Sequence, residues 1–317
     1  MSNALVPVTF QPIIQLILDS VTSPQSKRAY QKALEDFMRW FRDTQPSTGL
    51  SKATVQAYRQ FLLDTGLSAS TINLRLTAIR KLAMEAGDNE LMPHQAAEGI
   101  QRVPNVKAAG VRTGNWLTLQ QAEKLLALPD CSTLRGKRDR ALLAVLIGCG
   151  LRREEAASLY MDHIQLREAR WVIVDIRGKG NRVRSVPMPS WCKDAIDIWM
   201  RDRQIVPAES GFSFRIEFEV RRVFWPVNKG GNTVAYHPMS PQSIFMRVKK
   251  LAQEAGLGSI SPHDLRRTFA KLAHKGHAQL EQIQLSLGHA SIQTTERYLG
   301  VQQDLTNAPC DHLGIKI

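Results

Sequence analysis

Cysteines are scarce in this sequence, with 4 among 317 residues, and they stand far apart at Cys131, Cys149, Cys192 and Cys310. They show neither the close pairs of a zinc site nor the density of a small secreted scaffold. No stretch approaches the roughly 18 apolar residues of a membrane-spanning helix, and no basic segment followed by an apolar run opens the chain. We therefore expect free thiols, a cytoplasmic protein and no membrane partner.

The sequence also lacks a Gly-x-x-x-x-Gly-Lys-Ser/Thr loop for nucleotide phosphates and a cluster of carboxylates spaced to hold two metal ions. We expect no metal and no other cofactor. A composition of 43% hydrophobic and 22% charged residues excludes disorder of the whole chain. The 317 residues suffice for two domains that each bury a core.

Positive charge is in excess. The 42 Lys and Arg outnumber the 29 Asp and Glu, which gives a net charge of +13, and most of that charge follows residue 105. Because basic side chains release counterions from phosphates, the excess favours a nucleic acid as the partner. Charge alone leaves a membrane surface and a merely solubilising surface open as alternatives.

The first third of the chain has the apolar spacing of helices. The pattern predicts four of them, over residues 23–41, 51–64, 70–86 and 89–100. Gly66 and Gly87 are expected to end the second and the third. Together these segments predict a compact helical bundle.

Helical periodicity stops after residue 103, where Pro104, Gly110 and Gly114 gather among basic residues. We therefore expect a helical domain at 1–103, a basic linker at 104–115 and a second domain with a C-terminal tail at 116–317. Basic residues that could face phosphates, or form an ordinary solvated surface, are Lys27, Arg28, Lys32, Arg75, Arg102, Lys107, Arg112 and Arg267.

A first candidate motif runs from Gly150 through Arg152 to Glu155. The glycine is expected to end one helix and Arg152 to begin the next, where the helix dipole already attracts anions. Glu155, one turn later, can hold the Arg152 guanidinium from behind. Taken alone, the pattern is more typical of a surface ion pair.

A second candidate is a β-hairpin. Residues 171–176 are apolar and β-branched, residues 178–181 predict a turn, and Val183 and Val186 predict a return strand. Lys179 would stand at the tip of this hairpin. A tip lysine is usually just solvated, but it could also reach into a nucleic-acid groove beside a phosphate.

Two further motifs stand near the C-terminus. His263 and Arg266 follow Pro262, a residue that suits a helix start, so both side chains are expected on one face of the first turn. His289 ends a Leu-Gly-His sequence, and Tyr298 follows nine residues later. Each residue alone would more often be structural.

Together these motifs resemble those of the tyrosine recombinase, or phage integrase, family, over nearly the whole chain. The matching residues are Arg152, Lys179, His263, Arg266, His289 and Tyr298, with Glu155 in support. Arg267 is a departure, because the family often has histidine there, but no member of the core set is replaced. The implied fold is mainly α with a small β-sheet: a helical, SAM-like core-binding domain and a mixed α+β catalytic domain.

The resemblance implies that Tyr298 attacks a DNA phosphodiester. Arg152 and Arg266 would contact the two non-bridging oxygens, where charge develops. His263 would accept the phenol proton and Lys179 would protonate the departing 5' oxygen. Because the 3'-phosphotyrosyl bond conserves the energy of the diester, religation needs neither ATP nor a metal ion.

The implied function is that of a site-specific recombinase or integrase. Its partners would be duplex DNA with paired inverted half-sites and three further copies of the chain, which assemble into a tetrameric synapse. A type IB topoisomerase is the alternative, which the helical domain argues against. A DNA-binding protein without catalysis is a third reading, which the intact catalytic set argues against.

The resemblance further implies a simple Xer-like or integron-like architecture, because the helical domain begins almost at once. The expected location is the cytoplasm, at a bacterial nucleoid or as the product of a mobile element. Residues 206–238 are rich in aromatic side chains and could be a strand pair, an interaction surface or core.

Overall fold

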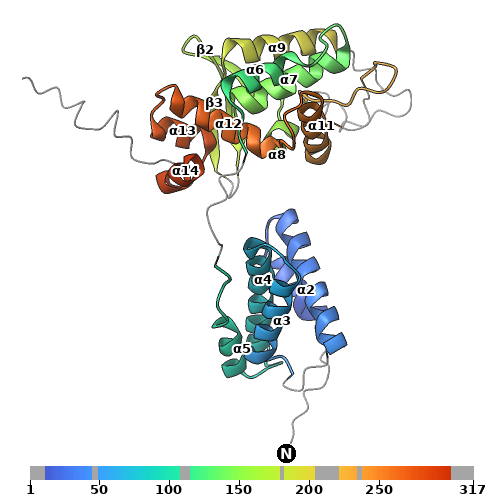
Figure 1. Ribbon diagram of the computed structural model, residues 1–317, viewed down its shortest axis with the longest axis vertical. Helices are drawn as coiled ribbons and strands as arrows, with labels where there is room; N and C mark the ends of the chain where they lie inside the picture. The colour runs from blue at the N-terminus through green and yellow to red at the C-terminus, as the bar shows by residue number, and fades with distance from the viewer. Residues whose placement is uncertain are drawn as a thin grey trace, which may run out of the picture. The chain divides into compact units, whose positions relative to one another are not determined.

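The computed structural model describes residues 11–44, 49–107, 115–178, 182–203, 221–233 and 238–300. The chain divides into two compact units, Met1–Arg112 and Thr113–Ile317, drawn in Figure 1 from blue to teal and from green to red. Each unit has its own hydrophobic core. Residues 108–114 of the predicted linker lie outside the described residues, and the domain limits stay a prediction.

The first unit is a bundle of helices. They are α1 (Gln11–Asp19), α2 (Pro24–Thr44), α3 (Lys52–Asp64), α4 (Ala69–Asp88) and α5 (His94–Gln101). Ser51 and Ser68 begin α3 and α4, because each side chain accepts a hydrogen bond from the amide three residues on. The four predicted helices are present. Helix α1 lies outside the predicted ranges, since an apolar run this short favours neither helix nor strand.

One predicted helix end is wrong. Gly87 does not terminate α4, which continues to Asp88. Gly87 is buried where α5 packs on α4, and a Cβ there would lie 3.2 Å from the Cβ of Ala97. The glycine therefore permits two helices to approach closely. Gly66, in contrast, follows α3 with a φ of +71°, as expected of a residue that ends a helix.

The second unit combines helices with a small sheet. Its elements are α6 (Leu119–Ala127), α7 (Leu134–Gly148), α8 (Arg153–Ala157), η1 (Met161–His163), β1 (Ile164–Arg167), β2 (Arg170–Arg177), β3 (Val183–Pro187), α9 (Ser190–Asp202), α11 (Pro241–Glu254), α12 (Pro262–Lys275), α13 (Leu280–Leu287) and α14 (Ile292–Leu299). The strands are antiparallel in the order β1-β2-β3. A mainly helical chain with a small sheet confirms the predicted fold class.

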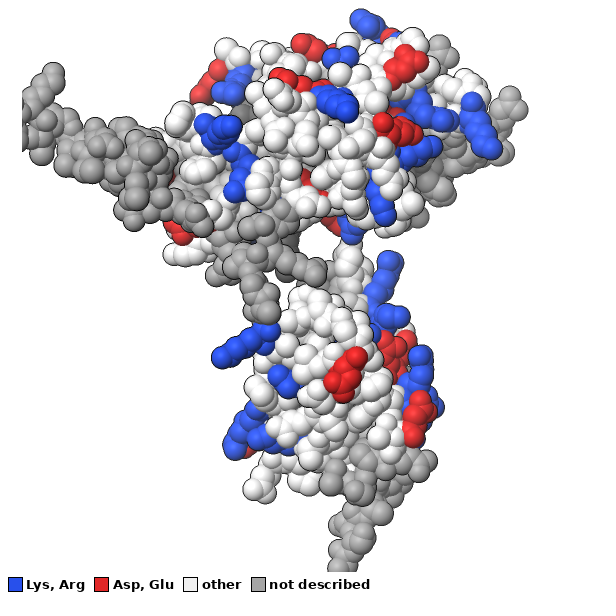
Figure 2. All heavy atoms as spheres, in the orientation of Figure 1, with Lys and Arg blue, Asp and Glu red and all other residues white. Residues whose placement is uncertain are grey.

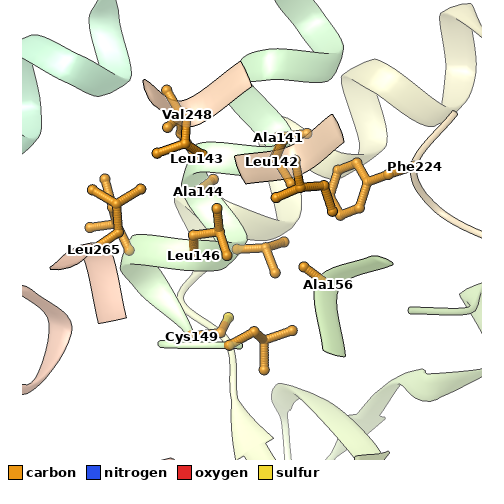
Figure 3. Close-up of a cluster of buried hydrophobic side chains, with 14 of the residues drawn as sticks. Ala141, Leu142, Leu143, Ala144, Leu146, Cys149, Ala156, Phe224, Val248 and Leu265 are labelled. Carbon is orange, nitrogen blue, oxygen red and sulfur yellow. The ribbon is translucent and has the colours of Figure 1, made fainter. Parts of the chain in front are cut away.

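Helix α7 is the centre of the second core. Every residue from Ala141 to Ile147 is buried, so this part of the helix has no solvent face. Such a helix forms where other elements surround it. Figure 3 shows its side chains among Ala156 of α8, Val248 of α11 and Leu265 of α12. The core thereby fixes the helices that carry the candidate site.

The predicted hairpin is present as β2 and β3. Ile173 pairs with Val186, and Ile176 pairs with Arg184, with a bulge between the two pairs. Strand β1, which pairs with β2, is an addition to the prediction. Residues 179–181, and with them Lys179, lie outside the described residues.

The aromatic segment at 206–238 is described only in part. Phe224 and Trp225 are buried in the second core, and Figure 3 shows Phe224 beside α7. Of the three readings of this segment, core therefore fits the described part. Phe212, Phe214, Phe218 and Tyr236 lie outside the described residues.

Cys131, Cys149 and Cys192 are free thiols, as predicted, and Cys310 lies outside the described residues. The sulfurs of Cys149 and Cys192 lie 3.9 Å apart in the second core. Within the ranges described, no helix is both long and apolar enough to cross a membrane.

Candidate active site

Arg152 stands at the N-cap of α8, directly after the chain leaves α7. The turn between the helices needs Gly150, whose φ is +59°, and a Cβ there would lie 2.6 Å from the Phe269 ring. The Arg152 side chain is 28% exposed. It can therefore contact an anion from solvent while it stays bound to the protein.

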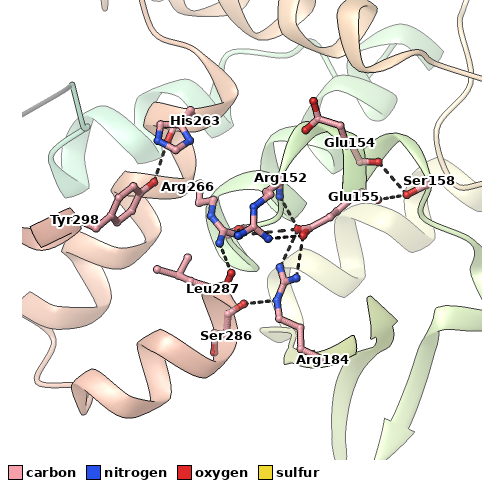
Figure 4. Close-up of polar contacts among 11 residues, drawn as sticks. Arg152, Glu154, Glu155, Ser158, Arg184, His263, Arg266, Ser286, Leu287 and Tyr298 are labelled. Carbon is pink, nitrogen blue, oxygen red and sulfur yellow. Dashed lines mark hydrogen bonds and ion pairs between the residues drawn. The ribbon is translucent and has the colours of Figure 1, made fainter. Parts of the chain in front are cut away.

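Glu155 on α8 binds arginines from two elements (Figure 4). Its Oε1 accepts a hydrogen bond from Nη1 of Arg152 at 2.7 Å, and its Oε2 accepts one from the Arg152 amide at 2.8 Å. Arg184 on β3 donates to both oxygens at 2.8 Å. Nη1 of Arg266 lies 3.9 Å from Oε2. The contact expected between Glu155 and Arg152 is thus present, and two further arginines join it.

The Glu155 carboxylate stays ionised over a wide pH range. Burial by itself would raise the pKa of Glu155, but hydrogen bonds and charge from Arg184, and then from Arg152, lower it to about 2. One negative charge therefore stands among three arginines. The cluster keeps an excess of positive charge that favours a phosphate at its exposed side.

Arg266 is held rigidly on the first turn of α12. Its side chain is buried, Nη1 donates to the Gly150 carbonyl at 2.6 Å, and Nη2 donates to the Leu287 carbonyl. Burial and the charge of Arg152 lower the pKa of Arg266 to about 9, so the guanidinium remains charged at pH 7. A cation fixed in this way needs no reorganisation when an anion arrives.

Tyr298 on α14 lies against the start of α12. Its hydroxyl donates to the main-chain carbonyl of His263 at 3.3 Å, and the two rings meet edge to face with centroids 5.5 Å apart. The Arg267 guanidinium lies 4.9 Å from the centre of the phenol ring. Burial raises the pKa of Tyr298, although the charges of Arg266 and Arg267 oppose that rise. The phenol is therefore protonated at pH 7 and needs a base before it can attack.

His263 meets the main requirement for that base, because it is neutral at pH 7. Partial burial, and then the charges of Arg267 and Arg266, lower its pKa. A neutral imidazole can accept a proton. Its ring is not the group that holds the Tyr298 hydroxyl, since that hydrogen bond goes to the carbonyl of the same residue.

His289 also contacts the Tyr298 ring edge to face, with the two ring centroids 5.2 Å apart. Burial and the charges of Arg266 and Arg152 lower the pKa of His289 to about 4. Nδ1 of His289 lies 3.0 Å from Oγ1 of the buried Thr295. This contact leaves Nε2 of a neutral ring for a further partner.

A cavity of about 280 Å³ opens beside these residues. Arg152, His263 and Arg266 line it together with Phe245 of α11 and Ser261. Two fixed guanidinium groups and a neutral imidazole suit a phosphodiester that is attacked by a nearby nucleophile. Among the described residues, no three His, Cys, Asp or Glu side chains are grouped as metal ligands.

Of the predicted site residues, the structure brings five together: Arg152, His263, Arg266, His289 and Tyr298. Lys179 and Arg112 lie outside the described residues. Arg75 binds Asp36 at 2.8 Å and Tyr58 at 3.3 Å within the first unit, and Arg102 lies 3.2 Å from Glu98. Arg28, Lys32 and Lys107 are exposed, and Lys27 is partly exposed. On the face in Figure 2, basic and acidic side chains alternate instead of forming one continuous basic patch.

Sequence reasoning missed two residues of the site, Arg184 and Thr295. Strand alternation was the available signal for Arg184, because it shares the face of β3 that carries the buried Val186. An arginine on the buried face of a strand requires a partner. Thr295 gave no such signal, because its contact depends on how α14 packs.

Two family matches cover most of the chain. Residues 115–304 match the phage integrase family, and residues 13–89 match the N-terminal SAM-like domain of phage integrases. A tyrosine recombinase of Synechococcus elongatus is 26% identical over 98% of this chain and 96% of its own length. Tyrosine recombinase XerC of Chlamydia trachomatis is 32% identical over 82% of this chain and 77% of its own.

Solved structures of similar fold include the XerH site-specific recombinase bound to a palindromic difH substrate, with a TM-score of 0.69 and 20% identity over 95% of this chain and 88% of that one. The Tn1549 transposon integrase in complex with transposon right end DNA has a TM-score of 0.66 and 17% identity over 96% and 99%. The family matches and the similar recombinases of Synechococcus elongatus and Chlamydia trachomatis support the recombinase reading over the topoisomerase alternative. The chain belongs to the phage integrase family and is a site-specific tyrosine recombinase, an enzyme that cleaves and rejoins DNA.

Proposed function

We propose that the catalytic set consists of Arg152, Lys179, His263, Arg266, His289 and Tyr298, with Glu155 in support. The observation that carries this proposal is the convergence of two arginines and two neutral histidines on a single tyrosine, from α8, α12, α14 and the end of α13. These segments are far apart in the sequence. A purely structural ion-pair network would not need a partly exposed tyrosine beside it.

In the proposed reaction the phenol oxygen of Tyr298 attacks the scissile phosphorus. Arg152 and Arg266 bind the two non-bridging oxygens, and His289 donates a hydrogen bond to one of them. The bond from phosphorus to the 5' oxygen breaks as the phosphotyrosyl bond forms. The reverse attack by a 5' hydroxyl of another strand completes the exchange and restores the phenol.

The phenol proton passes to the neutral His263 ring. Because the Tyr298 hydroxyl donates to the His263 carbonyl, the phenol must first turn from that carbonyl toward the ring. Hydrogen bonds of this kind are often long before the substrate binds. The raised pKa of Tyr298 and the lowered pKa of His263 both disfavour a spontaneous transfer, so the transfer accompanies attack.

Lys179 is proposed as the acid that protonates the departing 5' oxygen. Its role is tested by a DNA substrate whose scissile 5' oxygen is replaced by sulfur, because a thiolate leaves without a proton. We expect Lys179→Ala to cleave the ordinary substrate poorly and the sulfur substrate at close to the wild-type rate. A variant that is equally slow on both substrates would assign the proton to another group.

The proposed partners are duplex DNA with paired inverted half-sites and a tetramer of this chain at synapsis, in the cytoplasm. Arg28, Lys32, Arg102 and Lys107 are exposed and can contact phosphates. Arg75 is the least available, because Asp36 and Tyr58 already bind its guanidinium. The domain limits at 103 and 116 are part of the same proposal.

The decisive test is capture of the covalent intermediate. A pool of nicked duplexes with random sequence is incubated with the protein, and DNA that remains bound after denaturation is sequenced. We expect wild-type protein to capture a common sequence and Tyr298→Phe to capture none, while both bind the selected duplex equally. Tyr160→Phe removes a phenol hydroxyl from the same unit and serves as the control. Capture by Tyr298→Phe would show that another residue is the nucleophile.

A further inference from the structure

Arg184 is a largely buried arginine outside the proposed catalytic set. It lies on β3 opposite Ile176, and only 9% of its side chain is exposed. Burying a guanidinium is costly unless it is paired and hydrogen-bonded. The fold meets this requirement with contacts that lead directly to the candidate site.

The guanidinium of Arg184 contacts two segments besides its own strand. Nη1 and Nη2 each donate to the Glu155 carboxylate at 2.8 Å, and Nε donates to the Ser286 carbonyl at 2.8 Å. Figure 4 shows the side chain between α8 and the end of α13. Its stem packs on Gly288, where a Cβ would lie 2.9 Å from Cδ of Arg184.

The two segments that Arg184 contacts, α8 and the end of α13, each lie next to a proposed catalytic residue. Glu155 carries Arg152 on the same carboxylate, at 2.7 Å. Ser286 lies at the end of α13, three residues before His289. A helix end exposes unpaired carbonyl oxygens that cations stabilise. Arg184 binds one of these oxygens, so one side chain connects the position of Arg152 to that of His289.

These contacts use three of the five N–H donors of Arg184, and only 9% of the side chain is exposed. Each of its three nitrogens donates to a group of the protein. Arg152 differs, because it makes its Glu155 contacts while 28% of its side chain is exposed. Arg184 is therefore a poor ligand for a phosphate and a good link between the two segments.

We propose that Arg184 is a positioning residue for DNA cleavage, which fixes Arg152 and His289 relative to each other through Glu155 and the end of α13. This inference rests on the proposed function of those two residues. Arg184 acts only through them and does not touch the DNA.

The first experiment compares Arg184→Gln, Arg184→Lys and the control Arg170→Gln, which removes an exposed arginine from the neighbouring strand β2. Single-turnover cleavage of the captured duplex and equilibrium binding to it are measured. Misplacement of catalytic groups by about 1 Å can slow a reaction about 100-fold. We expect a loss of about that size for Arg184→Gln, a smaller one for Arg184→Lys, and no change in binding or in the control.

A second readout separates positioning from simple folding. In a Glu155→Gln background, the link through the carboxylate is already weakened. Removal of Arg184 should then cost at least about fivefold less than it does in the wild type, as expected for coupled residues. Loss of the same ion pair also lowers fold stability, so the cleavage rates are compared in conditions where thermal melting shows that every variant is folded.

A third readout is titration of His289 by NMR. Burial, Arg266, Arg152, Arg184 and His263 all lower its pKa. In Arg184→Gln the loss of the positive charge should raise the pKa of His289 above its value of about 4. Arg184→Lys keeps the charge and Arg170→Gln leaves Arg184 in place, so the pKa of His289 should rise less in these two variants.

Each outcome decides the proposal. Near wild-type cleavage by a folded Arg184→Gln, or equal losses in both Glu155 backgrounds, overturns it. If neither Arg184 variant folds, the residue serves folding and the positioning role is wrong. Failure of the wild type to form any covalent complex is a different result, because it overturns the proposed function and not only the role of Arg184.

Discussion

Two buried carboxylates of the second unit, Asp139 and Glu155, are both bound by arginines that line a cavity, but only the Glu155 cluster adjoins the tyrosine and the histidines of the candidate site. Asp139 on α7 accepts hydrogen bonds from Arg138 at 3.0 and 2.5 Å and from Arg247 of α11 at 2.8 Å. Its side chain is fully buried. The Asp139 cluster therefore joins α7 to α11, and its two arginines line a cavity of about 680 Å³.

The Glu155 cluster has three arginines around its carboxylate, and two of them, Arg152 and Arg266, line the cavity at the candidate site. A buried arginine–carboxylate pair, such as that of Asp139, is therefore not by itself evidence of a functional site. Both carboxylates have surplus positive charge and arginines that reach a cavity, so the Glu155 cluster is distinguished by the tyrosine and the two histidines beside it.

The largest effect is expected on the free energy of unfolding when Asp139 is replaced. Asp139→Asn leaves two arginines without a carboxylate, and breaking a buried ion pair costs about 3–5 kcal/mol. Asp36→Asn, which removes the partly exposed partner of Arg75, should cost about 1 kcal/mol or less. Urea unfolding measures both. Equal losses at the two sites would remove the distinction between buried and partly exposed pairs.

The arginines of the Glu155 cluster should instead determine the rate of DNA cleavage. Arg152→Ala or Arg266→Ala removes a donor to the developing charge, which costs about 3–4 kcal/mol in the cleavage step. Asp139→Asn, in conditions where it stays folded, should cleave at close to the wild-type rate. Single-turnover cleavage checks this contrast, and rapid cleavage by either arginine variant would move the phosphate site elsewhere.

Low pH should destabilise the protein by protonating Glu155. Its pKa is lowered from 4.5 to about 2, so its contribution to stability is present above pH 4.5 and is lost as pH falls toward 2. The change is on the order of 3 kcal/mol. We expect Glu155→Gln to have a flatter stability profile between pH 5 and about 2 than the wild type. Parallel profiles in urea titrations at several pH values would show that other carboxylates cause acid unfolding.

The smallest effect compares glycines of the two units. Gly66→Ala meets open space at a φ of +71° and should cost about 1 kcal/mol. Gly150→Ala has a similar φ of +59° but also meets the Phe269 ring, so it should cost at least about 1 kcal/mol more. Thermal melting measures the difference, and equal shifts would mean that the ring moves aside freely.

The fold was largely readable from local patterns. The helices of the first unit follow apolar spacing and serine caps, and β2 and β3 follow a β-branched run and a turn. The end of α4 was misread because Gly87 is required by the approach of α5, not by a turn. A local pattern cannot distinguish these two uses of glycine.

For the site, sequence determined which residue types were available and which helix turns carry them. Arg152 at the start of α8 and Arg266 on the first turn of α12 follow from Gly150 and Pro262. Tertiary structure alone decided that Arg184 binds Glu155 and that the Tyr298 hydroxyl binds the His263 carbonyl. The reason is physical, because the partners lie 29 and 35 residues apart in the sequence. Packing around α7 brings the segments of Arg184 and Glu155 together, and the separate apolar cluster of α12, α13 and α14 holds Tyr298 beside His263.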